Sequence, residues 1–222
     1  MNIERNIQEV NSRIARACER SRRLPSEITL VAVTKEVDIS AIRAAFDCGL
    51  KHFGENRVQE AESKITQLLD IRPGVTWHMV GHLQSNKAKR AVDLFDIIHS
   101  VDSVKLAEVL SRRTEALLSV LLQVNVSGEA TKSGFSVTEI GRASQDIKRL
   151  SNLKVLGLMT IAPLVADPEE VRPVFRRLRE LRDSLGLEHL SMGMTDDFEV
   201  AIEEGATIVR IGRAIFGERR QQ

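Results

Sequence analysis

The sequence predicts a closed (β/α)8 barrel of the TIM type, formed by one domain over residues 1–222, with an extra helix before the first strand. Eight short apolar runs alternate with segments of helical periodicity, which is the pattern of βα repeats. The runs are apolar on both faces, as in a parallel sheet covered by helices. No tract rich in Pro, Gly or Ser divides the chain. The alternative is an open doubly wound sheet, but it needs a glycine-rich turn where this chain has TKEVD.

The elements follow one another in a regular order. An amphipathic helix is predicted before Pro25, because apolar residues recur at helical spacing, at Ile3, Ile7, Val10, Ile14 and Ala17. The predicted strands are the runs at 30–34, 51–55, 76–81, 96–101, 119–126, 154–161, 188–193 and 207–212. Helical segments lie between them, among them 38–49, 56–70, 136–150 and 168–186. Each strand is thus followed by a crossover segment, as a barrel requires.

The composition argues against several classes of protein. Lys and Arg number 32 and Asp and Glu 31, so the net charge of +1 gives no electrostatic basis for a dedicated nucleic-acid binder. No apolar run has the length of a membrane span and the N-terminal segment is polar, so we expect a cytoplasmic protein. Cys18 and Cys48 stand apart, which predicts reduced, buried or half-buried thiols. His78 and His82 do not converge at strand spacing, so no metal site is predicted.

Polar residues follow the predicted strands, at the ends where a (β/α)8 barrel carries its chemistry. In chain order these ends are Lys35, Glu55–Asn56, His78–His82, Asp102, Asn125, Met159–Thr160, Ser191–Thr195 and Arg210–Gly212. We expect these side chains to converge at the mouth of the barrel. Lys35 ends the first strand, where a partly desolvated amine can act as a nucleophile. The alternative is a lysine that extends to the rim or pairs with Glu36 or Glu55.

Two turns containing glycine follow the seventh and eighth strands, which is the usual phosphate site of this architecture. Ser191, Gly193 and Thr195 follow strand seven, and Gly212 lies between strand eight and a last short helix. Backbone N–H groups at such turns bind anions, although each glycine taken singly is also explained by turn geometry. Together, opposite a strand-end lysine, the turns favour a phosphorylated carbonyl ligand held as a Schiff base.

Arg210 shares one face of its strand with Ile208 and Gly212, which places it inside the barrel. A buried guanidinium needs acceptors, because leaving it unpaired is costly. Two partners are compatible with this position: an inward carboxylate in a structural salt bridge, and a ring nitrogen of a bound cofactor.

These motifs resemble the pyridoxal phosphate homeostasis proteins, whose fold is similar to the barrel domain of bacterial alanine racemase. The resemblance runs in order through nearly the whole chain, in AVTKEV, HFGENRVQE, WHMVGHLQSNK, NVSGEATKSGF, GLMTI and SMGMTDDFEVAIEEGATIVRIGRAIFG. It implies that Lys35 carries pyridoxal 5'-phosphate (PLP) as a Schiff base and that Arg210 faces the pyridine nitrogen. It also implies a phosphate site and a ring pocket, formed by Ser191, Gly193, Thr195, Gly212 and Arg213 at the phosphate and by Asn56 and Met159 at the ring. Thr195 stands where many relatives have serine, which keeps the hydroxyl.

The resemblance implies a role without established turnover. Such a protein binds PLP, serves vitamin B6 and amino-acid homeostasis, and makes transient contact with PLP-dependent apoenzymes. We expect a monomer, because the helix patterns show no strongly apolar exposed face. The sequence supports a role without turnover, because it contains no tyrosine and the resembling racemases use a tyrosine as acid and base. Two alternatives stay open: a PLP-dependent amino-acid racemase or decarboxylase of low activity, and a Schiff-base aldolase for a sugar phosphate.

Overall fold

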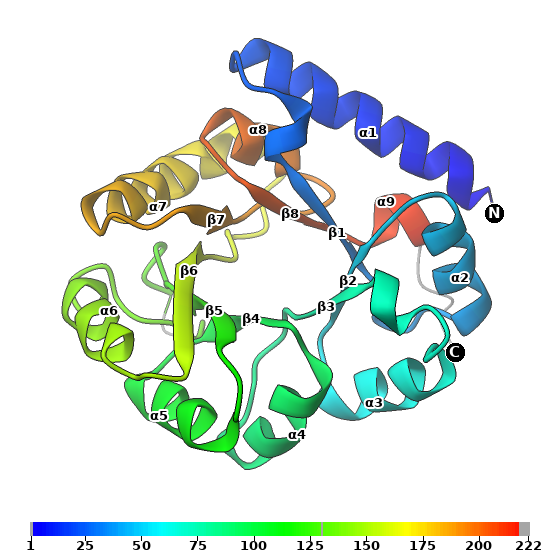
Figure 1. Cartoon of the computed structure of the whole chain (residues 1–222). Helices are drawn as coiled ribbons and strands as arrows, with labels where there is room; N and C mark the ends of the chain where they lie inside the picture. Colours follow the sequence, from blue (N-terminus) through cyan, green and yellow to red (C-terminus); the bar gives the residue numbers. More distant parts are fainter. Residues whose placement is uncertain (1, 130, 218–222) are drawn as a thin grey trace.

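The computed structural model describes residues 2–129 and 131–217. Eight parallel strands close into a barrel in the order of the sequence, with helices around the outside (Figure 1). The strands are β1 (Thr29–Val33), β2 (His52–Glu55), β3 (Thr76–Met79), β4 (Ile97–Val101), β5 (Leu118–Gln123), β6 (Leu153–Met159), β7 (His189–Ser191) and β8 (Ile208–Ile211). The predicted fold class and all eight predicted strands are confirmed.

The barrel closes between β1 and β8, where Val31 pairs with Arg210 in parallel register. Alternation along each strand directs one set of side chains into the barrel and the other toward the helices. The inward set includes a small apolar cluster of Val31, Leu121, Met159 and Ile208. The larger core lies between sheet and helices and contains the fully buried Trp77 and Phe175. The interior of the barrel is therefore only partly apolar, which leaves room for polar side chains inside it.

Helices cover the outside of the sheet. They are α1 (Ile3–Arg20), α2 (Ile39–Asp47), α3 (Val58–Gln67), α4 (Ala88–Leu94), α5 (Val104–Arg113), α6 (Ile140–Lys148), α7 (Arg172–Ser184), α8 (Phe198–Glu203) and α9 (Arg213–Phe216). The extra helix α1 is capped at its N-terminal end by Asn2, whose Oδ1 accepts from the backbone N–H of Arg5 at 3.0 Å. Its buried face packs against α8 and α9, as the apolar spacing predicted (Figure 1).

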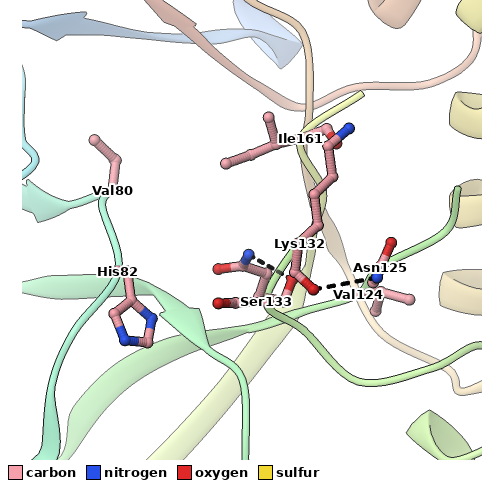
Figure 2. Close-up of a pocket in the computed structure, with 8 residues that line it drawn as sticks. Val80, His82, Val124, Asn125, Lys132, Ser133 and Ile161 are labelled. Atoms are coloured by element: carbon pink, nitrogen blue, oxygen red, sulfur yellow. Dashed lines mark hydrogen bonds between the residues drawn. The ribbon is translucent and has the colours of Figure 1, made fainter. Parts of the chain in front are cut away.

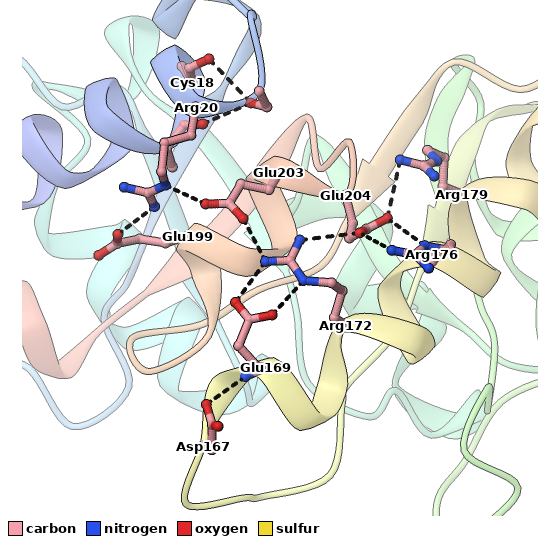
Figure 3. Close-up of polar contacts among 12 residues, drawn as sticks. Cys18, Arg20, Asp167, Glu169, Arg172, Arg176, Arg179, Glu199, Glu203 and Glu204 are labelled. Carbon is pink, nitrogen blue, oxygen red and sulfur yellow. Dashed lines mark hydrogen bonds and ion pairs between the residues drawn. The ribbon is translucent and has the colours of Figure 1, made fainter.

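A network of ion pairs joins α1, α7 and α8 on the outside of the barrel (Figure 3). Glu203 of α8 pairs with Arg20 of α1 and with Arg172 of α7, each at 2.6 Å. The buried Glu204 pairs with three arginines of α7 at 3.0 to 3.2 Å. Desolvation opposes ionisation of Glu204, but hydrogen bonds from Arg176 and Arg172 hold its pKa below the ordinary value. The network ties α8, and so the turn before it, to the rest of the molecule.

The two cysteines are free thiols in different surroundings. Cys18 is buried on the packed face of α1, as expected. Cys48 is exposed, and the expectation that it is buried or half-buried was wrong, because it caps the C-terminal end of α2 beyond the packed face. Within residues 2–129 and 131–217, the helices are all too short or too polar to cross a membrane.

Candidate functional site

Lys35 lies just past β1 at the mouth of the barrel, and its side chain is 23% exposed. Its Nζ is 3.6 Å from Oε1 of Glu36, so the surface pairing considered as an alternative is present, at a long distance. The turn after β8 lies beside it: a Cβ added to Gly212 would be 3.1 Å from the carbonyl oxygen of Val33, two residues before Lys35. The structure therefore brings the backbone that leads into Lys35 and the last glycine turn together.

A buried ion cluster holds the backbone on both sides of Lys35. Nζ of Lys64, in α3, donates to the carbonyl oxygen of Thr34 at 2.5 Å. The same ammonium pairs with Glu55 at 2.8 Å and with Glu60 at 2.6 Å. Glu60 also accepts, at 2.6 Å, from the backbone N–H of the residue after Lys35, which has a φ of 61°. Both peptide groups that flank Lys35 are thus bonded to one cluster.

Glu55 belongs to this cluster and not to the mouth of the barrel. Its Oε1 accepts from the hydroxyl of Thr34 at 2.6 Å and from Lys64, so it lies between the sheet and α3. Burial raises the pKa of Glu55, although the charge of Lys64 opposes this. The expectation that Glu55 converges on the mouth with the other strand-end residues was therefore wrong, because it occupies the helix-facing side of β2.

Arg210 lies inside the barrel, as its strand face predicted, and is 4% exposed. Nη1 donates to Oγ of Ser191 at 2.5 Å, and Nη2 donates to the carbonyl oxygen of Thr160 at 2.8 Å. Burial lowers the pKa of Arg210 to about 10, and the negative charge of Asp197 opposes this shift. Both bonds go to neutral acceptors, so the salt-bridge alternative does not describe this arginine.

The turns after β7 and β8 lie side by side. The backbone N–H of Arg210 donates to the carbonyl oxygen of Gly193 at 3.0 Å. Nη2 of Arg213, next to Gly212, contacts the carboxylate of Asp196 at 2.5 Å and so bridges the two turns. The guanidinium of Arg213 is half exposed and already has this partner. The structure therefore brings the two predicted phosphate turns together, with a surface ion pair between them.

The turn after β7 has a tightly packed backbone. Gly193 has a φ of 91°, and a Cβ there would lie 2.6 Å from Cβ of Ala201 in α8, so only glycine fits. Thr195 is half-buried in the same turn. Ser191 is fully buried at the end of β7, and its hydroxyl faces the interior of the barrel. The hydroxyl of Ser191 is thus bonded to two side chains of the protein.

Asn56 and Met159 lie at the ends of β2 and β6. Asn56 is half-buried, and its backbone packs against Gly81, where a Cβ would lie 2.3 Å from the carbonyl oxygen of Asn56. Met159 is fully buried and belongs to the apolar cluster inside the barrel. Asn56 is therefore accessible beside the mouth, whereas Met159 lies beneath it.

Three histidines and Ser191 form a hydrogen-bonded chain through the interior of the barrel. Nδ1 of His52 is 3.0 Å from Nε2 of His78, and Nδ1 of His78 is 2.9 Å from Nε2 of His99. Nδ1 of His99 is 2.9 Å from Oγ of Ser191, the hydroxyl that accepts from Arg210. Burial lowers the pKa of all three imidazoles, to about 3 for His78 and well below the ordinary value for His99.

Other strand-end residues have structural partners. Nδ1 of His82 is 3.2 Å from Asp102, whereas His78 contacts His52 and His99, so His78 and His82 have different partners. Nδ2 of Asn125 donates to the carbonyl oxygens of Glu129 at 2.8 Å and Lys132 at 3.2 Å, which shapes the loop after β5. Across residues 2–129 and 131–217, no group of three or more His, Cys, Asp or Glu side chains could hold a metal ion.

A cavity of about 180 Å³ opens at the mouth between the ends of β3, β5 and β6 (Figure 2). Asn125, Lys132 and Ile161 line it, and Nζ of Lys132 is 3.4 Å from the carbonyl oxygen of Ile161. A second cavity, of about 370 Å³, lies between the loops after β6 and β7 and is also lined by Lys132 and Ile161. Lys35 lines neither cavity. Both of these cavities thus lie toward the loops after β5 and β6, where Lys132 is their shared amine.

Sequence reasoning did not identify His52, His99 or Lys64 as parts of the site. The histidines did carry a signal, because His52, His78 and His99 come from three consecutive strands, each at a position that alternation can direct inward. Lys64 carried none, since it stands among polar residues of an amphipathic helix. Its burial against Glu55 is visible only in the folded chain.

The class of barrel follows from comparison with known proteins. The model of the family described as "Alanine racemase, N-terminal domain" matches residues 2–220, and the chain belongs to this family. Alanine racemase from Corynebacterium glutamicum is similar in structure, with a TM-score of 0.72 over 99% of this chain and 61% of that chain. At 19% identity, this likeness shows a shared fold.

Proteins with higher sequence identity to this chain than the racemase belong to a more specific family. The chain is 46% identical over 229 residues to "Pyridoxal phosphate homeostasis protein" from Aquifex aeolicus, covering 99% of this chain and 100% of that protein. The structure of PipY from Synechococcus elongatus with PLP bound has a TM-score of 0.86 and 37% identity, covering 97% of this chain and 100% of that chain. The family predicted from the motifs, the pyridoxal phosphate homeostasis proteins, is confirmed.

Proposed function

We propose that the protein binds PLP at the mouth of the barrel, holds it as a Schiff base on Lys35, and serves PLP and amino-acid homeostasis without catalysis. One observation carries this proposal: Lys35 lies just past β1, whose last residue, Val33, packs against the turn at Gly212, and β1 pairs with β8, which carries the buried Arg210. The names of the relatives, and the solved relative with PLP bound, support the choice of cofactor.

The donor set of the site fits the functional groups of PLP. A primary amine condenses with an aldehyde with loss of water, which suits Lys35. Backbone N–H groups at the adjacent turns suit a phosphate, with Gly193, Thr195 and Gly212 nearest to it in our assignment. A guanidinium is only a donor, so Arg210 suits a pyridine nitrogen that is only an acceptor. The aldehyde, the phosphate and the ring nitrogen of the cofactor thus each have a complementary partner.

The remaining contacts are assigned by position. Asn56, half-buried beside the mouth, contacts the ring, and Met159 forms the apolar surface beneath it. Ser191 and Arg213 belong to the phosphate turns, but their side chains bond to Arg210 and Asp196. We therefore assign their share of phosphate binding to the backbone.

The same residues argue for holding the cofactor rather than using it. Bound PLP supplies an aromatic ring that withdraws electrons, most strongly when its nitrogen is protonated. Arg210 disfavours that proton, because it is a charged donor. Lys35 serves one face of a substrate only, and the sequence contains no tyrosine for the other. We infer a non-catalytic carrier on these grounds.

We further propose that the carrier is a cytoplasmic monomer that makes transient contact with PLP-dependent apoenzymes through its mouth. The rim of the mouth supports contact with apoenzymes, because Leu164 is 94% exposed and Ile161 is 38% exposed beside the second cavity. Exposed apolar side chains around a ligand site favour contact with another protein. The net charge of +1 gives no support for nucleic acid as a partner.

Reduction with borohydride and peptide mass spectrometry test the proposed linkage. PLP-loaded protein should carry a pyridoxyl group on Lys35, and Lys35→Ala should abolish it while weak noncovalent binding is kept. Lys132→Ala is the matched control, because Lys132 is another amine at the mouth and its loss should leave the adduct intact. An adduct on Lys132 alone would refute the assignment. If the protein does not bind PLP, and borohydride instead traps a sugar phosphate on Lys35, the protein is an aldolase.

A further inference from the structure

The three interior histidines have no part in the function proposed above, yet they end at the arginine assigned to the cofactor ring. We propose that His99 and His78 are positioning residues, which hold the hydroxyl of Ser191 as an acceptor for Arg210 through a chain of coupled hydrogen bonds that begins at His52. This inference rests on the proposed function, because Arg210 is assigned there to the pyridine nitrogen.

Counting donors fixes how the hydrogens are arranged. Arg210 can only donate, so Oγ of Ser191 accepts from it and keeps one hydrogen to give. The other partner of Oγ is Nδ1 of His99, at 2.9 Å, which accepts that hydrogen when it carries a lone pair. A neutral imidazole has one donor and one acceptor, so Nε2 of His99 must then donate to Nδ1 of His78.

The rule extends along the chain to its far end. Nε2 of His78 donates to Nδ1 of His52, so all three histidines carry their hydrogen on Nε2. His52 is the first residue of β2, at the end of the barrel away from Lys35, and is only half-buried, so its Nε2–H is free to meet solvent. In the opposite arrangement, the buried hydroxyl of Ser191 would accept twice and its hydrogen would lack an acceptor in the chain.

Electrostatics support the same arrangement. The charge of Arg210 disfavours a proton on His99, and burial disfavours charge on all three rings, so the chain stays neutral. Asp197 is the other charged group that acts on Arg210. Nη2 of Arg210 is separately held by Thr160, so the guanidinium is fixed at two points and its remaining N–H groups are directed elsewhere. A ring nitrogen at the mouth is the acceptor that the proposed function supplies.

The first test needs no cofactor. Nitrogen-15 NMR of the imidazoles in the unaltered, cofactor-free protein distinguishes a protonated from an unprotonated ring nitrogen. We expect His52, His78 and His99 to be neutral Nε2–H tautomers near neutral pH. In Ser191→Ala, the anchor of the chain is removed, and His99 should become a mixture of tautomers. Nδ1–H tautomers in the unaltered protein would overturn the proposal, whether or not PLP binds.

The second test uses PLP as the probe. His99→Phe removes the acceptor for Ser191, and we expect PLP affinity to fall about tenfold. The pH at which the visible absorption of bound PLP changes should also rise by about one unit, because a less firmly held Arg210 opposes ring protonation less. A purely structural role for His99 would not move this pH profile.

Two further variants make the second test specific. In His99→Gln, the amide oxygen accepts from Ser191 and the amide nitrogen donates to His78, so this variant should restore both affinity and pH profile. His189→Gln is the matched control: His189 is in β7 with Ser191, but its ring faces Thr207. Unchanged affinity and pH profile in His99→Phe would refute the positioning role. Failure of the unaltered protein to bind PLP would instead refute the proposed function. The histidine tautomers would still show whether the hydrogen-bonded chain of histidines exists.

Discussion

Mild acid should destabilise the fold through His78. This side chain is 1% exposed, and its pKa is about 3 against an ordinary value of 6.5, because burial disfavours the charged form and His52 adds a smaller repulsion. The folded pKa lies below the unfolded one. The contribution of His78 is therefore fully present above the unfolded value and is lost as the pH falls from 6.5 toward about 3.

The magnitude follows from the two pKa values. At a pH of about 5, His78 is almost fully protonated in the unfolded chain and almost fully neutral in the folded one. The unfolded pKa lies about 1.5 units higher, and each unit corresponds to about 1.4 kcal/mol, so the loss is about 2 kcal/mol relative to neutral pH. That is a large share of the roughly 5 to 15 kcal/mol that stabilises a typical domain. His52 and His99 act in the same direction, since burial lowers their pKa values too.

Urea titration of the cofactor-free protein measures this loss. The chain contains one tryptophan, Trp77, which is fully buried next to His78, so its fluorescence reports unfolding. The His78→Gln side chain keeps a donor and an acceptor but does not titrate. His189→Gln is the control, because it removes a histidine that is not part of the hydrogen-bonded histidines. From neutral pH to a pH of about 5, the unaltered protein should lose about 2 kcal/mol more than His78→Gln. If the unaltered protein and His78→Gln lose the same free energy of unfolding within about 0.5 kcal/mol, His78 does not cause the loss.

The buried ion cluster, the phosphate turns and the ring partner each lead to a prediction. Lys64→Met leaves Glu55 buried without its cation and should lower the free energy of unfolding by about 3 to 5 kcal/mol in the same titration; an unchanged midpoint would contradict this. Pyridoxal, which lacks the phosphate, should bind at least about tenfold more weakly than PLP in a spectroscopic titration. Gly212→Leu should cause a similar loss for PLP because its side chain would meet Val33, and equal affinities would show that the turns do not bind phosphate. Alanine and serine should turn over far more slowly than about 1 per second, and rapid racemisation by chiral chromatography that disappears in Lys35→Ala would make the protein an enzyme.

The sequence by itself determined the fold and the strand faces of the main site residues. Eight apolar runs with helical segments between them are the local signature of a βα barrel, and each run became a strand. Alternation placed Arg210 inside the barrel, and the position of Lys35 after its strand placed the amine at the mouth. These features depend on periodicity within about ten residues, so they are readable without knowing what lies opposite.

Only the tertiary structure decided which side chains meet. Ser191 bonds to His99, 92 residues earlier in the chain, and Arg210 bonds to Thr160, 50 residues earlier. Glu55 lies at a strand end like the other polar residues, but its side chain faces the helices and forms an ion pair with Lys64 of α3. Periodicity states which face of a strand a residue occupies, but barrel closure and helix packing determine its partner on that face. Hydrogen bonds depend on distances of about 3 Å between such partners, so the histidine chain and the cluster behind Lys35 became visible only in the closed barrel.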